Sequence, residues 1–444
     1  MMAQRGASGS TERRFEGLLG LITLLAVAWR LVYVSLEPRF QAFSDENWYV
    51  TEAHRLFGPR PFTAVFQSQF PSAQHGPLTS IVLSPVAWAF PSSSSGLRFV
   101  MAVIGGAVIV VMGLLGRQLG GERVGILCAG LAAANPGFWV RDGLATSETI
   151  STLLVALLLL VALHFLESPR LVVATALGAL LGLAALARGE LLLLAPLFVI
   201  PVLVIGLRRQ RLSAGRKIAA VALCAVALLA VLSPWVGFNA GRFQRTVLLT
   251  NNLGTTLAGA DCKAGFYYGP LIGYDALLCN AAADKIAGAT SNDEAVRSDI
   301  ERSIALHYVG EHLSRVPLVL VMREAWLLGL YRPGWVVSLS VAIGQPTWAT
   351  WSQAVGLWIL IPLAVVGALL RRRKELAVWP ELLFVLNTLL VAAIFVGHWR
   401  YRITAEVAML PLAAIAIDES WQRWSDRVAA PPADDILPSS STTS

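Results

Sequence analysis

Charged residues are scarce in this sequence: Asp, Glu, Lys and Arg make up 14% of the 444 residues, whereas 56% are hydrophobic. Histidine and cysteine are scarce as well, with six and four residues. A soluble chain of this length could not bury so much apolar surface, so the composition indicates a polytopic membrane protein. No basic face with interleaved aromatics is present, so the net charge of +7 does not indicate a nucleic-acid partner.

A helix needs about 20 apolar residues to cross a bilayer, with about 17 as a lower limit. Ten segments have close to this length. They are 17–36, 97–116, 124–140, 149–166, 171–187, 191–207, 217–237, 351–370, 378–396 and 403–420. Two further stretches, 77–90 and 316–331, are short or interrupted by charge. The first segment lacks an A-x-A cleavage site, so we expect an uncleaved span rather than a signal peptide.

Short basic loops set the expected orientation. Cations precede the first span and recur at 117–123, 208–217 and 371–374. If all of them face the cytoplasm, the two doubtful stretches lie along the outer membrane surface and both termini are inside. The sequence then divides into a cytoplasmic segment 1–16, a transmembrane domain 17–420 and a largely disordered cytoplasmic tail 421–444. The outer segments are then the loops 37–96 and 238–350 and the short stretches 141–148, 188–190 and 397–402, and they hold nearly every unusual polar residue.

The four cysteines fall into two groups. Cys128 and Cys224 lie in apolar spans, where a small buried side chain is the ordinary role. Cys262 and Cys279 lie in the large outer loop, where an oxidising exterior and a modest separation predict a disulfide. No further Cys or His lies near them at metal-ligand spacing.

The stretch "FSDENWYVTEAHRLFG" (43–58) holds the first candidates for chemistry. Asp45 and Glu46 are consecutive, so on a helix they diverge by about 100° and only one can point at a given target. Asp45 can simply cap a helix with Glu46 in its first turn. It can also be a carboxylate base at the membrane surface, and the two roles are compatible.

Other polar residues lie in the same outer segments, each with a structural alternative. His75 in "QHGPL" either precedes a helix start or binds substrate or metal, and Glu148 in "RDGLATSETI" either caps a helix or lines a site. Arg188 and Glu190 in "LARGELLLLAPL" either pair with each other or line a cavity. Asn252, in the Asn- and Gly-rich "NNLGTT", suits a tight turn and also a sugar hydroxyl.

The late motif "GHWRYRITAEVAMLPL" places Arg400 and Arg402 on either side of Tyr401 at the outer membrane edge. Arginines on the outer side are unusual, because Lys and Arg are normally enriched in cytoplasmic loops. They either snorkel to lipid headgroups or bind a phosphate through their guanidinium forks. Glu406, one turn further on, could orient them.

The order of these motifs resembles that of the GT-C glycosyltransferases. The segments that carry it are "SDENWYVTEAHRLF", "QHGPL", "SETISTLLVALLLL", "GLAALARGELLLLAPL", "PWVGFN" with "NNLGTTLAGA", and "RYRITAEVAMLPLAAIA", over about residues 17–420. The group is glycosyltransferase 39-like, with dolichyl-phosphate-mannose–protein mannosyltransferases, aminoarabinose transferases and the RgtA/B/C/D-like bacterial proteins. One departure is "HGPL", where many relatives read His-Pro-Pro-Leu.

This resemblance implies an all-α polytopic membrane protein of the GT-C fold, with about 10–12 transmembrane or re-entrant helices and extracytoplasmic loops. It implies a glycosyltransferase that moves a sugar from a polyprenyl-phosphate donor to an acceptor hydroxyl by inverting displacement. Asp45 is the first choice as base, with Glu46 close behind. Arg400 and Arg402, with Arg188, would bind the donor phosphate. The expected substrate-binding residues are His75, Glu148, Glu190, Asn252, Tyr401 and Glu406.

The expected location is the plasma membrane, with the active site on the extracytoplasmic side and a role in cell-envelope glycan or glycoprotein synthesis. The partners are the sugar carrier, the bilayer and a glycan, lipid or protein acceptor. No cofactor is assigned, and a divalent metal stays open because the ligand set is thin. The alternatives are an O-antigen-ligase-type enzyme with a diphosphate-linked donor, or a lipid-linked sugar transporter, although mid-membrane ionisable residues and repeated broken helices are not evident.

Overall fold

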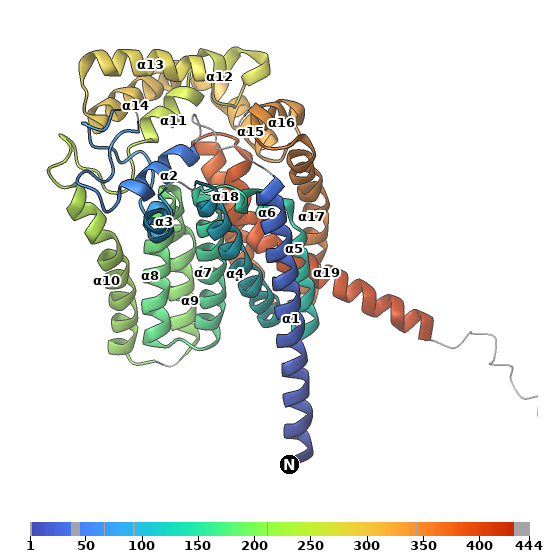
Figure 1. Cartoon of the computed structure of the whole chain (residues 1–444). Helices are drawn as coiled ribbons and strands as arrows, with labels where there is room; N and C mark the ends of the chain where they lie inside the picture. Colours follow the sequence, from blue (N-terminus) through green and yellow to red (C-terminus); the bar gives the residue numbers. More distant parts are fainter. Residues whose placement is uncertain are drawn as a thin grey trace, which may run out of the picture.

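The computed structural model describes residues 2–36, 45–65, 67–91, 94–210, 212–342 and 344–429. Over these ranges the chain is built from helices, and the sole β-type contact is an isolated bridge between Thr63 and Pro71. The long helices stand side by side as a bundle, and shorter helices cover one end of it (Figure 1). This all-helical architecture confirms the predicted fold class.

Within the described ranges, six helical segments are long and apolar enough to cross a membrane. They belong to α1 (Met2–Leu36), α4 (Ser94–Gly120), α7 (Ser147–Glu167), the run η1 (Gly189–Leu193), η2 (Ala195–Val199) and α9 (Ile200–Arg209), α10 (Ala214–Asn239), and α17 (Thr347–Arg373). Three more predicted spans are α8 (Leu171–Ala187), α18 (Trp379–Ile394) and part of α19 (Ile403–Ala429). Of these, α8 and α18 are shorter apolar helices.

The predicted span 124–140 is two helices, α5 (Glu122–Ala134) and α6 (Pro136–Asp142). Asn135 precedes a proline, which disfavours the helical conformation at that residue. Its backbone is extended, and its side chain accepts a hydrogen bond from the Gly137 N–H and so caps α6. The break turns α6 toward the covered end of the bundle, where the motif that follows it reaches the candidate site.

Close helix contacts rest on small residues. A Cβ on Gly178 of α8 would lie 1.9 Å from the Cys224 carbonyl oxygen of α10, and one on Gly367 of α17 would lie 1.9 Å from the Leu412 oxygen of α19. Only glycine admits such close backbones, as expected where packing rather than water drives helix association. Cys128 and Cys224 are buried and free, in agreement with their expected role.

The outer loops predicted from the sequence supply the covering helices. The first provides α2 (Asp45–Arg55) and α3 (Leu78–Ala89). The second provides α11 (Leu253–Ala260), α12 (Lys263–Tyr267), η3 (Gly269–Leu271), α13 (Leu277–Thr290), α14 (Glu294–Glu311), η4 (Leu313–Arg315), α15 (Val316–Leu327) and α16 (Pro333–Ala342). These elements gather at one end of the bundle (Figure 1). A short turn, η5 (Trp399–Arg402), joins α18 to α19.

The basic loops lie at the opposite end. The Arg371 guanidinium donates to the Leu119 carbonyl oxygen at 3.0 Å, which places the end of α17 beside the end of α4. Lys374 pairs with Glu419 at 2.6 Å, and the α9–α10 connection lies at this end too (Figure 1). The two ends therefore separate the basic loops from the polar candidates, as the sequence predicted.

The predicted tail 421–444 begins as helix rather than as a disordered segment. Helix α19 continues to Ala429, and residues 430–444 lie outside the described ranges. Trp421, Trp424 and Val428 recur at helical spacing and are 57–67% exposed. These residues form one apolar stripe, and charged residues such as Arg423 lie on other faces of the helix. This amphipathic pattern explains why the helix continues beyond the last apolar run.

Candidate active site

Helix α2 carries the first candidate into the covered end of the bundle. Its Trp48 and Tyr49 side chains are buried at 2% and 3% exposure, and they anchor the helix against the loop that follows. Asp45 is its first residue, where a carboxylate is favoured by the helix dipole. Burying these aromatics therefore fixes the direction of the Asp45 side chain.

Asp45 forms an ion pair with Arg400, although 355 residues separate them in sequence. The His75 Nε2 atom lies 3.7 Å from the other Asp45 oxygen. Burial raises the pKa of Asp45, but Arg400 and His75 outweigh it and hold the pKa well below its usual range. The carboxylate is therefore ionised at neutral pH and can accept a proton only when its cation moves away.

Glu46 points elsewhere and is held on all sides. Its two oxygens accept hydrogen bonds from the Arg98 guanidinium at 2.7 and 2.6 Å, and one also accepts from the Ala145 N–H at 2.8 Å. The Glu46 side chain is 3% exposed. The two adjacent carboxylates thus differ: Asp45 pairs directly with Arg400 and remains partly exposed, and Glu46 ties α2 to α4.

The loop that carries His75 is clamped in place. The His75 ring packs between Trp48 and Tyr49, with ring centroids 5.2 Å from each. A Cβ on Gly76 would lie 2.2 Å from the Leu186 carbonyl oxygen, so the loop approaches the end of α8 as closely as glycine allows. Burial lowers the pKa of His75 despite Asp45 beside it, which makes the ring neutral at pH 7.

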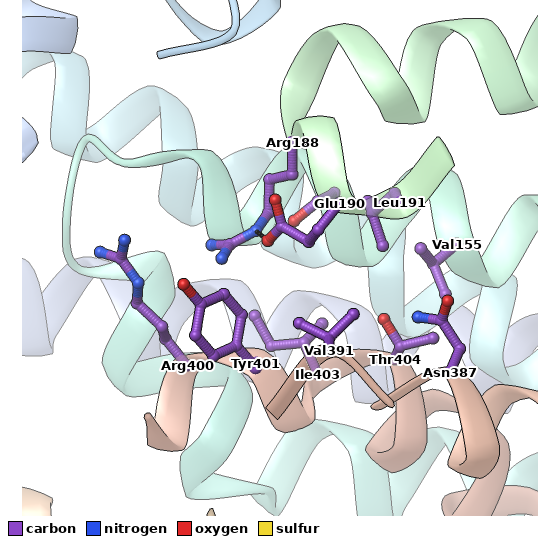
Figure 2. A pocket seen from close by; sticks show the side chains of 11 residues that line it. Val155, Arg188, Glu190, Leu191, Asn387, Val391, Arg400, Tyr401, Ile403 and Thr404 are labelled. Atoms are coloured by element: carbon purple, nitrogen blue, oxygen red, sulfur yellow. Dashed lines mark hydrogen bonds and ion pairs between the residues drawn. The ribbon is translucent and has the colours of Figure 1, made fainter. Parts of the chain in front are cut away.

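Arg188 is the centre of a second charged group. Its guanidinium contacts Glu190 at 2.6 Å and Glu148 at 3.0 Å, and it lies 5.3 Å from the centroid of the Tyr401 ring. The Arg400 guanidinium lies 5.8 Å from the same ring. Figure 2 shows Tyr401 and Arg400 opposite Arg188 and Glu190, which come from another part of the chain. Both alternatives posed for Arg188 and Glu190 hold, because the two pair and also line a cavity.

Arg402 and Glu406 lie apart from this group. They pair at 2.8 Å with side-chain exposures of 4% and 2%. Glu406 also accepts a hydrogen bond from the Asn135 amide at 2.9 Å, and Arg402 donates to the Gln353 carbonyl oxygen. They line neither of the two large cavities described next. This pair joins α19 to the break between α5 and α6 and to α17.

Two large cavities meet at Asp45 and Arg400, which line both. The arginine cavity, of about 880 Å³, is named for four of its lining residues: Arg188, Arg245, Arg302 and Arg400. The tyrosine cavity, of about 1070 Å³, is named for Tyr267, Tyr268 and Tyr274. The contact between Asp45 and Arg400 is therefore the point at which molecules in the two cavities could meet.

The remaining predicted residues divide between these cavities. His75, Glu190, Asn252 and Tyr401 line the arginine cavity, and Glu148 lines the tyrosine cavity, as does Glu46. A third, small cavity of about 10 Å³ lies beside Tyr401 and has room for about one water molecule (Figure 2). The Asn387 side-chain oxygen on its wall has no hydrogen-bond partner among the residues that the structure describes, which suits a bound water there.

The predicted disulfide is present: Cys262 and Cys279 are bonded across 17 residues, and Cys279 lines the tyrosine cavity. The expected brace of the outer loop is therefore confirmed. A metal site fits less well, because among the residues that the structure describes no group of three or more His, Cys, Asp and Glu side chains could hold an ion. The nearby carboxylates of Asp45, Glu148 and Glu190 are instead paired with arginines.

Sequence reasoning missed several residues at the site. His398, Asp275 and Tyr274 line the tyrosine cavity beside Arg400. His398 lies in the motif "GHWRYR", in which the arginines give the stronger signal. Arg98 was also missed, because nothing local in the sequence announces that it is the partner of Glu46.

Comparisons with known proteins bear on the family and the fold of this chain. Residues 74–238 match the family model described as dolichyl-phosphate-mannose-protein mannosyltransferase. The archaeal oligosaccharyltransferase AglB of Archaeoglobus fulgidus, solved with an inhibitory peptide and dolichol-phosphate, is similar with a TM-score of 0.55 at 15% identity, over 95% of this chain and 53% of that one. A structure of the A. fulgidus oligosaccharyltransferase with Zn and sulfate has a TM-score of 0.52 at 18% identity, over 93% of this chain and 50% of that one. No curated protein sequence matches.

This chain thus spans about half the length of these oligosaccharyltransferase chains. ArnT of Cupriavidus metallidurans bound to undecaprenyl phosphate matches over 92% of this chain and 81% of that one, at 18% identity and a TM-score of 0.43. The family match and the shared fold confirm the resemblance to the GT-C superfamily that the motifs predicted.

Proposed function

We propose that this protein transfers a sugar from a polyprenyl-monophosphate carrier to an acceptor hydroxyl, at the contact between Asp45 and Arg400. The observation that carries the proposal is the meeting of two large cavities at this single ion pair. A transferase needs separate space for donor and acceptor, and it needs opposite charges where they meet. The match of residues 74–238 to a mannosyltransferase family supports the same reaction class.

The arginine cavity suits the donor. Its walls include Leu192, Leu193 and Pro196 from a membrane-spanning segment, beside Arg188 and Arg400. An isoprenoid tail could lie along these apolar side chains while the phosphate meets the two guanidinium groups, which form strong charge-assisted hydrogen bonds with phosphate oxygens. Arg400 and Arg188 would then stabilise the charge that builds up on the leaving phosphate.

Asp45 would serve the acceptor. As the acceptor oxygen bonds to the anomeric carbon, the bond from that carbon to the phosphate oxygen breaks and the acceptor proton passes to Asp45. The phosphate monoester leaves as an anion and needs no proton. Arg400 holds the pKa of Asp45 low in the free protein. A donor phosphate that draws Arg400 away would raise this pKa and make Asp45 a stronger base when the donor is bound.

A single displacement of this kind inverts the anomeric configuration. The site lies at the end of the bundle opposite the basic loops (Figure 1). By the positive-inside rule that end faces away from the cytoplasm, so we place the reaction on the extracytoplasmic face of the plasma membrane. The reaction as written takes no step through a metal.

The test is a transfer assay with the full chain in lipid nanodiscs. It would compare polyprenyl-monophosphate sugars with the matching diphosphate-linked sugars, and would measure both the released carrier and the anomer of the product. We expect release of polyprenyl monophosphate and a product of inverted configuration. Turnover of the diphosphate donors alone would support the ligase-type alternative, and the absence of carrier release from every donor would refute the proposal.

A further inference from the structure

The tyrosine cavity has a distinct chemical character. Tyr268 and Trp335 line it and keep 58% and 39% of their surface exposed. Beside them are Asp275 and His398, with side-chain exposures of 30% and 34%. The cavity thus combines open aromatic faces with half-buried hydrogen-bonding groups, and it reaches Asp45 at its inner end.

These polar groups are ordered before any ligand arrives. The Tyr274 hydroxyl lies 3.0 Å from His398 Nε2, and the Asp275 carboxylate lies 4.0 Å from the same atom. Burial and the nearby Arg400 lower the pKa of His398 to about 4, although Asp275 opposes them. His398 is therefore neutral at pH 7, and a neutral imidazole can both donate and accept a hydrogen bond.

The loop that carries Asp275 is fixed at several points. The disulfide between Cys262 and Cys279 encloses it. The Gly273 N–H donates to the Gly265 carbonyl oxygen at 2.9 Å, and the Tyr331 hydroxyl donates to the Gly269 carbonyl oxygen at 2.7 Å. Holding a binding group in place before association reduces the entropy lost on binding.

We propose that the tyrosine cavity binds a carbohydrate acceptor, whose hydroxyls bond to Asp275 and His398 and whose rings pack on Tyr268 and Trp335. This inference rests on the proposed function and names its acceptor class. Sugars present hydroxyls at their edges and C–H groups on their faces, so a sugar site needs both hydrogen-bonding side chains and aromatic rings. A cavity of about 1070 Å³ is at the upper end for small-molecule sites and admits more than one ring.

A peptide acceptor fits these walls less well. Extended peptides commonly bind by adding a strand to an exposed sheet edge. The cavity is lined by residues of α12, α13 and α16 and of the loop between α12 and α13, with others from α2, α6, α7 and η5, and the part of the chain described here contains no named strand. Helical backbone groups are already paired within the helix. Recognition by the helical part of the wall must therefore come from side chains, which favours a ligand rich in hydroxyls.

The experiment uses the full chain in nanodiscs with one accepted polyprenyl-phosphate sugar. Fluorescently tagged oligosaccharides of two to four sugars would be compared with Ser- and Thr-containing peptides that carry the same tag. We expect transfer to oligosaccharides and none to peptides. Asp275→Asn should raise the KM for the oligosaccharide at least tenfold, since it removes a charged hydrogen-bond acceptor, and should leave the KM for the donor unchanged.

Two variants separate binding from folding. Tyr268→Ala should raise the acceptor KM, and Tyr268→Phe should restore it, because the ring and not the hydroxyl carries the packing. Asp284→Asn is the matched control: this carboxylate is 52% exposed on α13 and lines neither large cavity. It should leave both KM values unchanged.

The outcomes distinguish the two proposals. Transfer to peptides alone, or an Asp275→Asn effect confined to the donor, would overturn the carbohydrate assignment. Release of polyprenyl phosphate by hydrolysis, with no oligosaccharide glycosylated, would also overturn it but leave the proposed function standing. Absence of carrier release under every condition would refute the proposed function itself.

Discussion

Replacing Asp45 by Asn is expected to lower kcat by about 10²–10⁴-fold, the usual contribution of a general base, while the protein stays folded. The Asp45 side chain is 35% exposed toward the cavities and makes one ion pair with a partner that is itself 27% exposed. Asn keeps the size of the side chain and loses only the proton acceptor. The measurement is single-turnover transfer from saturating donor, with thermal unfolding recorded on the same preparation.

Glu46→Gln is the matched control for this prediction. Breaking a buried ion pair by removing one partner costs about 3–5 kcal/mol in free energy of unfolding, and here it would leave the Arg98 charge unbalanced inside the protein. We expect a lower unfolding temperature and near-normal turnover per folded molecule. The reverse pattern, with Glu46→Gln inactive and Asp45→Asn active, would exchange the two roles.

Arg400→Gln is expected to lower kcat by about 10²–10³-fold, as when one stabilising donor is removed from a developing anion. It should also change the pH profile. Without Arg400, burial dominates and the pKa of Asp45 rises. Since transfer requires ionised Asp45, the acid limb of kcat/KM should move to higher pH, so that residual activity is lost at a less acidic pH than in the wild type.

Arg402→Gln provides the comparison two residues away. Arg402 is buried with Glu406 and lines neither large cavity, so its loss should destabilise the fold and leave the pH profile unchanged. Both variants would be assayed from pH 4 to 9 against their own folded fractions. If Arg402→Gln moved the acid limb and Arg400→Gln did not, the phosphate-binding assignment would belong to Arg402.

The sequence predicted the apolar helices and the gathering of polar motifs at one end, because hydrophobic length and cationic loops are local properties. It could not choose between Asp45 and Glu46, or between Arg400 and Arg402. Within each pair the residues point in different directions, and the choice depends on partners far along the chain. Glu46 is defined by Arg98, 52 residues away, and no local pattern records such a contact.

The helix break at Asn135 is a second feature that could not be predicted from the sequence pattern. The residues 124–140 are apolar except for Asn135, so hydropathy predicts one span, yet the Asn-Pro pair ends α5 and caps α6. The break also supplies the Asn135 amide that holds Glu406. The Asn-Pro pair is evident in the sequence, but the hydrogen bond from Asn135 to Glu406, 271 residues later in the chain, is not.

The central claim is that Arg400 passes from Asp45 to the carrier phosphate. The most direct measurement is the affinity of the full chain in nanodiscs for a short-chain polyprenyl monophosphate, compared between the wild type and Asp45→Asn. The account predicts that Asp45→Asn binds this phosphate severalfold more tightly, because Arg400 is freed and a like charge is removed, although the variant transfers sugar far more slowly than the wild type. Weaker binding by Asp45→Asn would contradict the account.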